Sequence, residues 1–96
     1  MTAKRLDPPE RETALASLPA WRYDSGRDAI VRDFSFADFV GAFGFMAKVA
    51  LLAERANHHP EWSNIYANVS ILLTTHSANG LSELDIALAR EIDRLI

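Results

Sequence analysis

Residues 36–62, FADFVGAFGFMAKVALLAERANHHPEW, are the stretch that decides the fold. Apolar residues recur there at helical spacing, in the series Phe36, Phe39, Val40, Phe43, Ala47 and Ala50. Ser35 and Asp38 resemble a capping box at the start of this series. The pattern therefore predicts a helix from about residue 36 to residue 56, which at roughly 1.5 Å per residue spans about 30 Å.

The end of the same stretch places two histidines outside the helix. Asn57 suits a helix end, and Pro60 bars the helix from continuing. His58 and His59 lie between them. We therefore expect both histidines in a connection between a helix and a strand.

The predicted helix is apolar on more than one side. Beyond the first series it carries a second apolar set, Phe45, Met46, Val49, Leu51 and Leu52. A helix that lies on a sheet covers only one stripe of its surface, so the second set needs another cover. Either a partner subunit or a short neighbouring helix of the same chain would supply it.

A β-hairpin is predicted on each side of this helix. On the N-terminal side, aromatic and charged residues alternate from Trp21, Ser25-Gly26 indicates a turn, and residues 29–34 favour a strand. On the C-terminal side, residues 63–75 favour two strands, with Ala67-Asn68 as the expected turn.

A helix is predicted towards each end of the chain. Asp7 caps a short helix that begins at Pro8-Pro9, and Pro19 stops it. Ser82 with Asp85 resembles a second capping box, ahead of the amphipathic series Leu84, Leu88, Ile92 and Leu95. The order α-β-β-α-β-β-α predicts an α+β fold, in which an antiparallel four-stranded sheet carries three helices on one face. We expect a single domain over residues 1–96.

Size and charge narrow the classes of partner. The chain has 96 residues, no cysteine and a formal charge of −3 at pH 7. A chain this short buries only roughly 60 to 65% of its unfolded surface, so we expect a homo-oligomer, either a dimer or a tetramer.

The acidic balance gives no general attraction to nucleic acid. No apolar run approaches the roughly 20 residues of a membrane span, and no leader pattern is recognisable, so we expect no membrane partner and a cytoplasmic location.

The three histidines are the best candidates for chemistry. They lie between residues 58 and 76, and the predicted hairpin would bring His76 back beside His58 and His59. An unperturbed pKa of about 6.5 suits histidine to give and take protons near neutral pH. A zinc site of three histidines and a water is the alternative, although adjacent side chains tend to point apart.

Two carboxylates and two aromatic residues near the histidines have either a functional or a purely structural role. Glu54 lies one turn before the histidine pair, and Asp85 lies in the first turn of the last helix. Either carboxylate would orient a histidine ring, or be a solvated or capping residue. Trp62 and Tyr66 fit core or hairpin packing better than a ligand platform.

A longer motif connects these residues to a known family. The chain carries Glu54-x-x-x-His58-His59-Pro60-Glu61-Trp62, then Thr75-His76, Gly80-Leu81-Ser82 and Asp85. With this motif it resembles the pterin-4a-carbinolamine dehydratases, a family also called dimerization cofactor of a homeodomain transcription factor. The resemblance runs from Trp21 to the C-terminus, and its specific part is the histidine-histidine-proline element with the third histidine at the family's spacing.

The resemblance implies an activity. Such an enzyme, a lyase, converts 4a-hydroxytetrahydrobiopterin (pterin-4a-carbinolamine) into quinonoid dihydropterin and water, in tetrahydrobiopterin recycling. The family uses neither a metal nor an organic cofactor. A functional link to an aromatic amino-acid hydroxylase would follow.

The resemblance also implies roles for individual residues. His58 and His76 would form the acid–base pair, and His59 would chiefly bind and orient the pterin. Substrate contacts would come from two segments, namely His58, His59 and Pro60, and Thr75, His76, Ser77 and Ala78. The supporting residues would be Glu54, Asp85 and Trp62.

A non-enzymatic function is the alternative. The same family includes a member that binds and stabilises a dimeric transcription factor through its helices, so a partner-binding or dimerization module is the second hypothesis. The complete histidine set favours catalysis, because a pure scaffold needs none of it. The pterin side chain is not determined by these residues.

Overall fold

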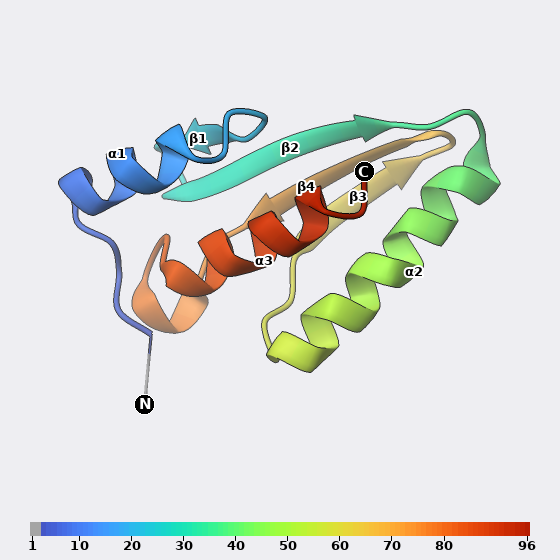
Figure 1. Cartoon of the computed structure of the whole chain (residues 1–96). Helices are drawn as coiled ribbons and strands as arrows, with labels where there is room; N and C mark the ends of the chain where they lie inside the picture. The colour runs from blue at the N-terminus through green and yellow to red at the C-terminus, as the bar shows by residue number, and fades with distance from the viewer. Residues whose placement is uncertain (1–2) are drawn as a thin grey trace.

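A four-stranded antiparallel sheet forms one layer of the protein, and three helices form the other (Figure 1). The structure is a computed structural model that describes residues 3–96. Its elements are α1 (Pro8–Ala16), β1 (Arg22–Asp24), β2 (Ala29–Ser35), α2 (Phe39–Ala56), β3 (Glu61–Ile65), β4 (Asn68–Leu73), the 3₁₀ turn η1 (His76–Ala78) and α3 (Glu83–Asp93). The predicted α+β class and element order are confirmed.

The sheet has the strand order β1-β2-β4-β3, so each predicted hairpin contributes one inner and one edge strand. The inner strands pair with Ile30 opposite Leu73 and Phe34 opposite Val69. Alternate residues of these strands face the helices and are buried, whereas Asp33 on the opposite face is exposed. The core lies between this face and the helices. Its members include Ile30, Phe34, Val69, Ile71, Leu73, Phe45, Val49, Leu88, Ala89 and Ile92.

Helix α2 begins later than predicted. Its N-cap is Asp38, whose side chain accepts a hydrogen bond from the Gly41 backbone N–H at 2.8 Å. Ser35, the predicted cap, is instead the last residue of β2, and its hydroxyl donates to Asn68 at 2.8 Å. The backbone N–H of Phe36 still pairs across the sheet with Ala67. Strand pairing therefore extends past the residues where the helical pattern begins.

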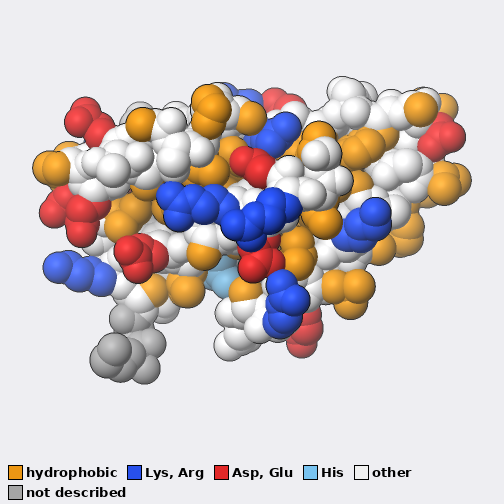
Figure 2. Space-filling model, viewed as in Figure 1, with side chains coloured by type: hydrophobic (Ala, Val, Ile, Leu, Met, Phe, Trp, Pro, Cys, Tyr) orange, Lys and Arg blue, Asp and Glu red, His pale blue; other side chains and the backbone are white. Residues whose placement is uncertain are grey.

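The faces of α2 are the reverse of the expected ones. Its buried residues are Ala42, Phe45, Val49 and Ala53, so two members of the predicted second set form the core face. Most of the first series is exposed instead. We call the large exposed members of α2 the α2 stripe, which consists of Phe39, Val40, Phe43 and Leu51. Figure 2 shows orange side chains along the side of the molecule where Figure 1 places α2.

The second hairpin turns one residue earlier than predicted. Its connecting residues are Tyr66 and Ala67, because Ile65 pairs with Asn68. Tyr66 has a left-handed φ of 50° and is 65% exposed, so the expectation that it packs in the hairpin is wrong. Trp62, in contrast, is partly buried and packs against the core, as expected.

Helix α3 is fixed at both ends. The predicted capping box is present, with the Ser82 hydroxyl accepting from the Leu84 backbone and the Asp85 carboxylate accepting from the Ser82 backbone. At the other end, Asp93 accepts hydrogen bonds from Arg32 at 2.6 Å and from Trp21 at 2.9 Å. Leu84 itself is exposed, contrary to its predicted place on the apolar face.

The capping box of the first helix is also present, between Asp7 and Glu10. No helix within residues 3–96 combines the length and hydropathy that crossing a bilayer requires.

Candidate active site

His58 is held in a buried pair with Asp85. The chain leaves α2 through Asn57, the predicted helix end, which adopts a left-handed conformation with φ of 50°. The His58 backbone N–H then donates to the carbonyl of Ala53 at 3.0 Å. Its Nε2 atom lies 2.5 Å from Oδ1 of Asp85, and the Asp85 side chain is fully buried. The end of α2 and the first turn of α3 thus meet at this pair.

The second oxygen of Asp85 binds the segment that leads to His76. Thr75 donates its hydroxyl to Asp85 Oδ2 at 2.7 Å, and the Ser82 backbone N–H donates to the same atom at 2.9 Å. His58 and Thr75 therefore share one carboxylate. The two ends of the second hairpin thus meet at Asp85, through His58 on one side and Thr75, the residue before His76, on the other.

His59 forms a second histidine–carboxylate pair. Its Nε2 atom lies 2.8 Å from Oε1 of Glu54, which projects from the last turns of α2. The His59 side chain is 58% exposed and the Glu54 side chain is 80% exposed. Each of the two candidate carboxylates thus contacts a histidine, one in the interior and one in solvent.

His76 lies on a short loop that its own backbone closes. It begins the 3₁₀ turn η1 and is exposed, as is Ser77, while Ala78 is half-buried. The Thr75 N–H donates to the Gly80 carbonyl at 3.0 Å, and the Gly80 N–H donates back to Thr75 at 3.2 Å. We refer to residues 75–80 as the His76 loop.

Glu61 is a neighbour of this loop that was not among the predicted site residues. Arg27 donates to its carboxylate at 2.7 Å. This hydrogen bond holds the pKa of the Glu61 carboxyl below its usual value, with a smaller contribution from nearby His76. The signal in the sequence was the position of Glu61 directly after the His-His-Pro element.

Of the other predicted site residues, Pro60 directly follows His59 and Trp62 lies in β3. Pro60 is half-buried between His59 and β3. Among residues 3–96, no buried side-chain nitrogen or oxygen lacks a hydrogen-bond partner. The same residues contain no group of three or more histidine, cysteine or acidic side chains placed to hold a metal ion.

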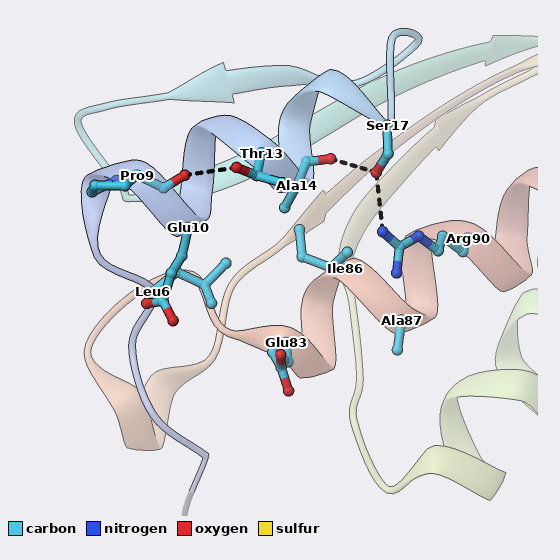
Figure 3. Close-up of a pocket in the computed structure, with 10 residues that line it drawn as sticks. All are labelled: Leu6, Pro9, Glu10, Thr13, Ala14, Ser17, Glu83, Ile86, Ala87 and Arg90. Atoms are coloured by element: carbon cyan, nitrogen blue, oxygen red, sulfur yellow. Dashed lines mark hydrogen bonds between the residues drawn. The ribbon is translucent and has the colours of Figure 1, made fainter.

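The predicted site does not coincide with a groove between α1 and α3. This groove has a volume of about 700 Å³, and Arg90 donates to the Ser17 hydroxyl there at 3.0 Å (Figure 3). Leu6, Ala14 and Ile86 contribute to its apolar wall. None of the predicted catalytic or substrate-contacting residues lines it. The chemistry of the histidines, rather than the depth of a hollow, marks the candidate site.

The arrangement suits proton transfer. An imidazole can give or take a proton near neutral pH, and the contact between Nε2 of His58 and Asp85 fixes the orientation of this ring. Exposed His59 and His76 reach solvent and any ligand there. Such a set can supply proton donors and acceptors.

Comparison with known proteins identifies the family. Residues 4–95 match the family described as pterin 4 alpha carbinolamine dehydratase. The chain belongs to this family. A relative from Rhizorhabdus wittichii, whose name assigns it provisionally to the pterin-4-alpha-carbinolamine dehydratases, is 56% identical over 99% of this chain and 98% of its own length. A Rhodopseudomonas palustris relative with the same name is 52% identical over 96% of this chain and 91% of its own length.

Solved structures of pterin-4-alpha-carbinolamine dehydratase relatives share the fold. A Brucella melitensis protein described as a transcriptional coactivator/pterin dehydratase has a TM-score of 0.92 at 50% identity, covering 96% of this chain and 98% of that one. A pterin dehydratase-like protein described as a RuBisCO assembly factor of the alpha-carboxysome has a TM-score of 0.68 at 26% identity, covering 79% of this chain and 88% of that one. The fold therefore occurs in proteins described as dehydratases and in one described as an assembly factor.

Proposed function

We propose that this protein is a 4a-hydroxytetrahydrobiopterin dehydratase that works by histidine acid–base catalysis. The observation that carries the proposal is the Asp85 carboxylate shared by His58 and Thr75, which brings the His58–Pro60 and Thr75–Ala78 segments together. The family and the names of its relatives support the same reaction. The reaction serves tetrahydrobiopterin recycling, which links the protein to an aromatic amino-acid hydroxylase in the cytoplasm.

The chemistry requires one acid and one base. The substrate loses the hydroxyl group of C4a as water, which needs a proton at the departing oxygen. The adjacent ring nitrogen loses its proton, which gives the quinonoid product. His58, whose side chain is 10% exposed, and His76, which is exposed, carry out these two transfers.

The remaining residues bind the flat pterin. His59 orients the ring from the solvent side, with Glu54 supporting the imidazole. Pro60 contributes beside it, and Thr75, Ser77 and Ala78 offer backbone groups from the other segment. Trp62 and Asp85 support the site from the core side.

A dehydration assay with synthetic 4a-hydroxytetrahydropterin, run with and without chelator, tests the proposal. We expect dehydration well above the spontaneous rate, and unchanged activity after exhaustive dialysis against chelator, since histidines acting as proton carriers need no metal. Added zinc should inhibit by occupying the imidazoles. A rate equal to the spontaneous one excludes the enzyme, and activity that chelator removes and zinc restores excludes the acid–base mechanism.

A second function, protein binding, is favoured by the α2 stripe. This stripe exposes four large apolar side chains, Phe39 (48%), Val40 (78%), Phe43 (58%) and Leu51 (74%). So much apolar surface on one helix face is unfavourable in water and typical of an interaction surface. Phe39 and Phe43 stack with ring centroids 5.9 Å apart. We propose that this stripe is buried in a homo-oligomer, and that a partner-binding module would use the same surface.

Light scattering at micromolar concentration tests the oligomer. We expect a dimer or tetramer for the natural chain and a smaller species for Phe43→Glu, because a charge at the centre of the stripe cannot be buried unpaired. Asp33→Asn, on the other face of the sheet, should leave the mass unchanged. A monomer of the natural chain at this concentration would refute the proposal.

A further inference from the structure

Asp28 is a buried anion outside the predicted site. It ends the turn between β1 and β2 with a left-handed φ of 48° and is only 7% exposed. Its carboxylate accepts hydrogen bonds from the Tyr23 hydroxyl at 2.6 Å and from Nε of Arg5 at 2.7 Å. Burial raises the pKa of Asp28, but the hydrogen bonds from Tyr23, Arg5 and the Leu81 backbone outweigh it and hold that pKa below its usual value.

Asp28 touches both ends of the His76 loop. Just before the loop, the Thr74 hydroxyl donates to the backbone carbonyl of Asp28 at 3.0 Å. At the far end, the Asp28 carboxylate lies so close to Gly80 that a Cβ there would be 2.1 Å from Oδ2. The Leu81 backbone, next in the chain, also contributes to the lowered pKa of Asp28. Only a residue without a side chain permits this approach at position 80.

The His76 loop is anchored at its first residue, because the Thr75 hydroxyl contacts Asp85 and Ser82, but its other residues have no side-chain hydrogen bond that holds the loop. It contains one 3₁₀ turn of three residues and a left-handed Asn79, so its own regular structure is minimal. Thr75 and Gly80 close its base. The contacts with Asp28 flank this closure on both sides. A group that binds both flanks lowers the conformational entropy of the loop between them.

We propose that Asp28 is a positioning residue for His76. It acts through the backbone of the His76 loop and touches neither His76 nor the substrate. Arg5 and Tyr23 hold the carboxylate against Gly80, so the N-terminal segment and the first hairpin both contribute to the geometry of the site. The expected effect of Asp28 on catalysis rests on the proposed function. Its expected effect on the order of the His76 loop rests on the contacts alone.

Asp28→Asn is the variant that isolates the charge. Asparagine has the same shape and also tolerates left-handed φ, so the turn is conserved. Asp33→Asn is the matched control, because Asp33 is an ion-paired aspartate of the same hairpin, 2.8 Å from Arg22 and exposed. If Asp28→Asn fails to fold, Tyr23→Phe takes its place in both experiments below. That variant removes one of the hydrogen bonds to the Asp28 carboxylate.

Amide hydrogen exchange measures the structural part. The Ala78 and Gly80 N–H groups both bond the Thr75 carbonyl inside the loop. In Asp28→Asn we expect their exchange to accelerate about tenfold relative to the natural chain, while the amides of α2 stay unchanged. Asp33→Asn should show no acceleration in the loop. Equal protection in Asp28→Asn and the natural chain would overturn the proposal.

A double-mutant cycle with His76→Ala measures the catalytic part. We expect Asp28→Asn to lower kcat about tenfold in the natural chain and to have no further effect in His76→Ala, because its target is then missing. A general loss of structure would instead multiply the two effects, and that result would overturn the proposal. If the natural chain itself shows no dehydration, the proposed function fails, whereas the exchange experiment still decides whether Asp28 orders the loop.

Discussion

His58 and His59 are neighbours in the chain with the same chemistry and opposite surroundings. His58 pairs with a fully buried Asp85 at 2.5 Å, and His59 pairs with a largely exposed Glu54 at 2.8 Å. In the interior, low polarity strengthens the attraction, and a lost partner leaves a buried group unsatisfied. In solvent, water and salt screen the pair and replace either partner. Similar distances therefore imply different energies and different roles.

The largest expected difference is in the rate of dehydration. His58→Ala and His76→Ala should each lower kcat by roughly 10²- to 10⁴-fold, the usual contribution of a general acid or base. A stopped-flow dehydration assay at several pH values would measure it, with Asp33→Asn as a control outside the site. Unchanged turnover in the double variant would remove both histidines from the mechanism.

Stability should distinguish the two carboxylates next. Asp85→Ala leaves His58, Thr75 and the Ser82 N–H without their acceptor in the interior, so we expect the free energy of unfolding to fall by about 3 to 5 kcal/mol. Glu54→Ala should lower it by less than about 1 kcal/mol. Urea denaturation measures the free energy of unfolding of both variants. An equal decrease in the two would contradict the conclusion that the buried pair contributes more to stability than the exposed one.

His58→Ala should also cost stability, because it leaves Asp85 buried without its imidazole partner. We expect an unaltered fold for His76→Ala, because His76 is exposed, whereas kcat for His58→Ala must be measured on protein shown to be folded.

A smaller effect is expected at His59. His59→Ala should raise KM about tenfold and change kcat by less than about threefold, because an exposed ring that orients the pterin contributes mainly to binding. Steady-state kinetics with the synthetic substrate separate the two constants. A kcat defect with unaltered KM would assign His59 to proton transfer instead.

The smallest effect is expected at Glu54. Glu54→Gln keeps a hydrogen-bond acceptor beside His59 but loses the charge, so KM should rise no more than about twofold. Raising the salt concentration should shift KM of the natural chain by a similar amount and leave Glu54→Gln unaffected. A salt effect of equal size in both proteins would mean that the pair does not act electrostatically.

Much of the fold could be predicted because its signals are local. Asp7 and Ser82 cap their helices through residues only three positions away, and Asn57 ends α2 through its own tolerance of left-handed φ. The hairpin between them also predicted that the segments of His58 and His76 meet, and Asp85 joins His58 to Thr75, the residue before His76. Ser35 was misplaced because β2 pairs with β4 as far as Asn68, a residue far away in the chain. Tyr66 was misplaced because Ile65 pairs with Asn68, which puts the turn one residue earlier than the local turn signal indicated.

By itself, the sequence determined the order of the elements, the breaks at Asn57 and Pro60, and the set of three histidines, because each depends on neighbouring residues alone. Only the tertiary structure decided which side of α2 is the core, since apolar residues cover both sides and the choice depends on where the sheet and α3 lie. The tertiary structure also made His58 an interior residue and left His59 in solvent. Burial depends on which distant residues pack around a side chain, and two adjacent identical residues carry no local signal that distinguishes them.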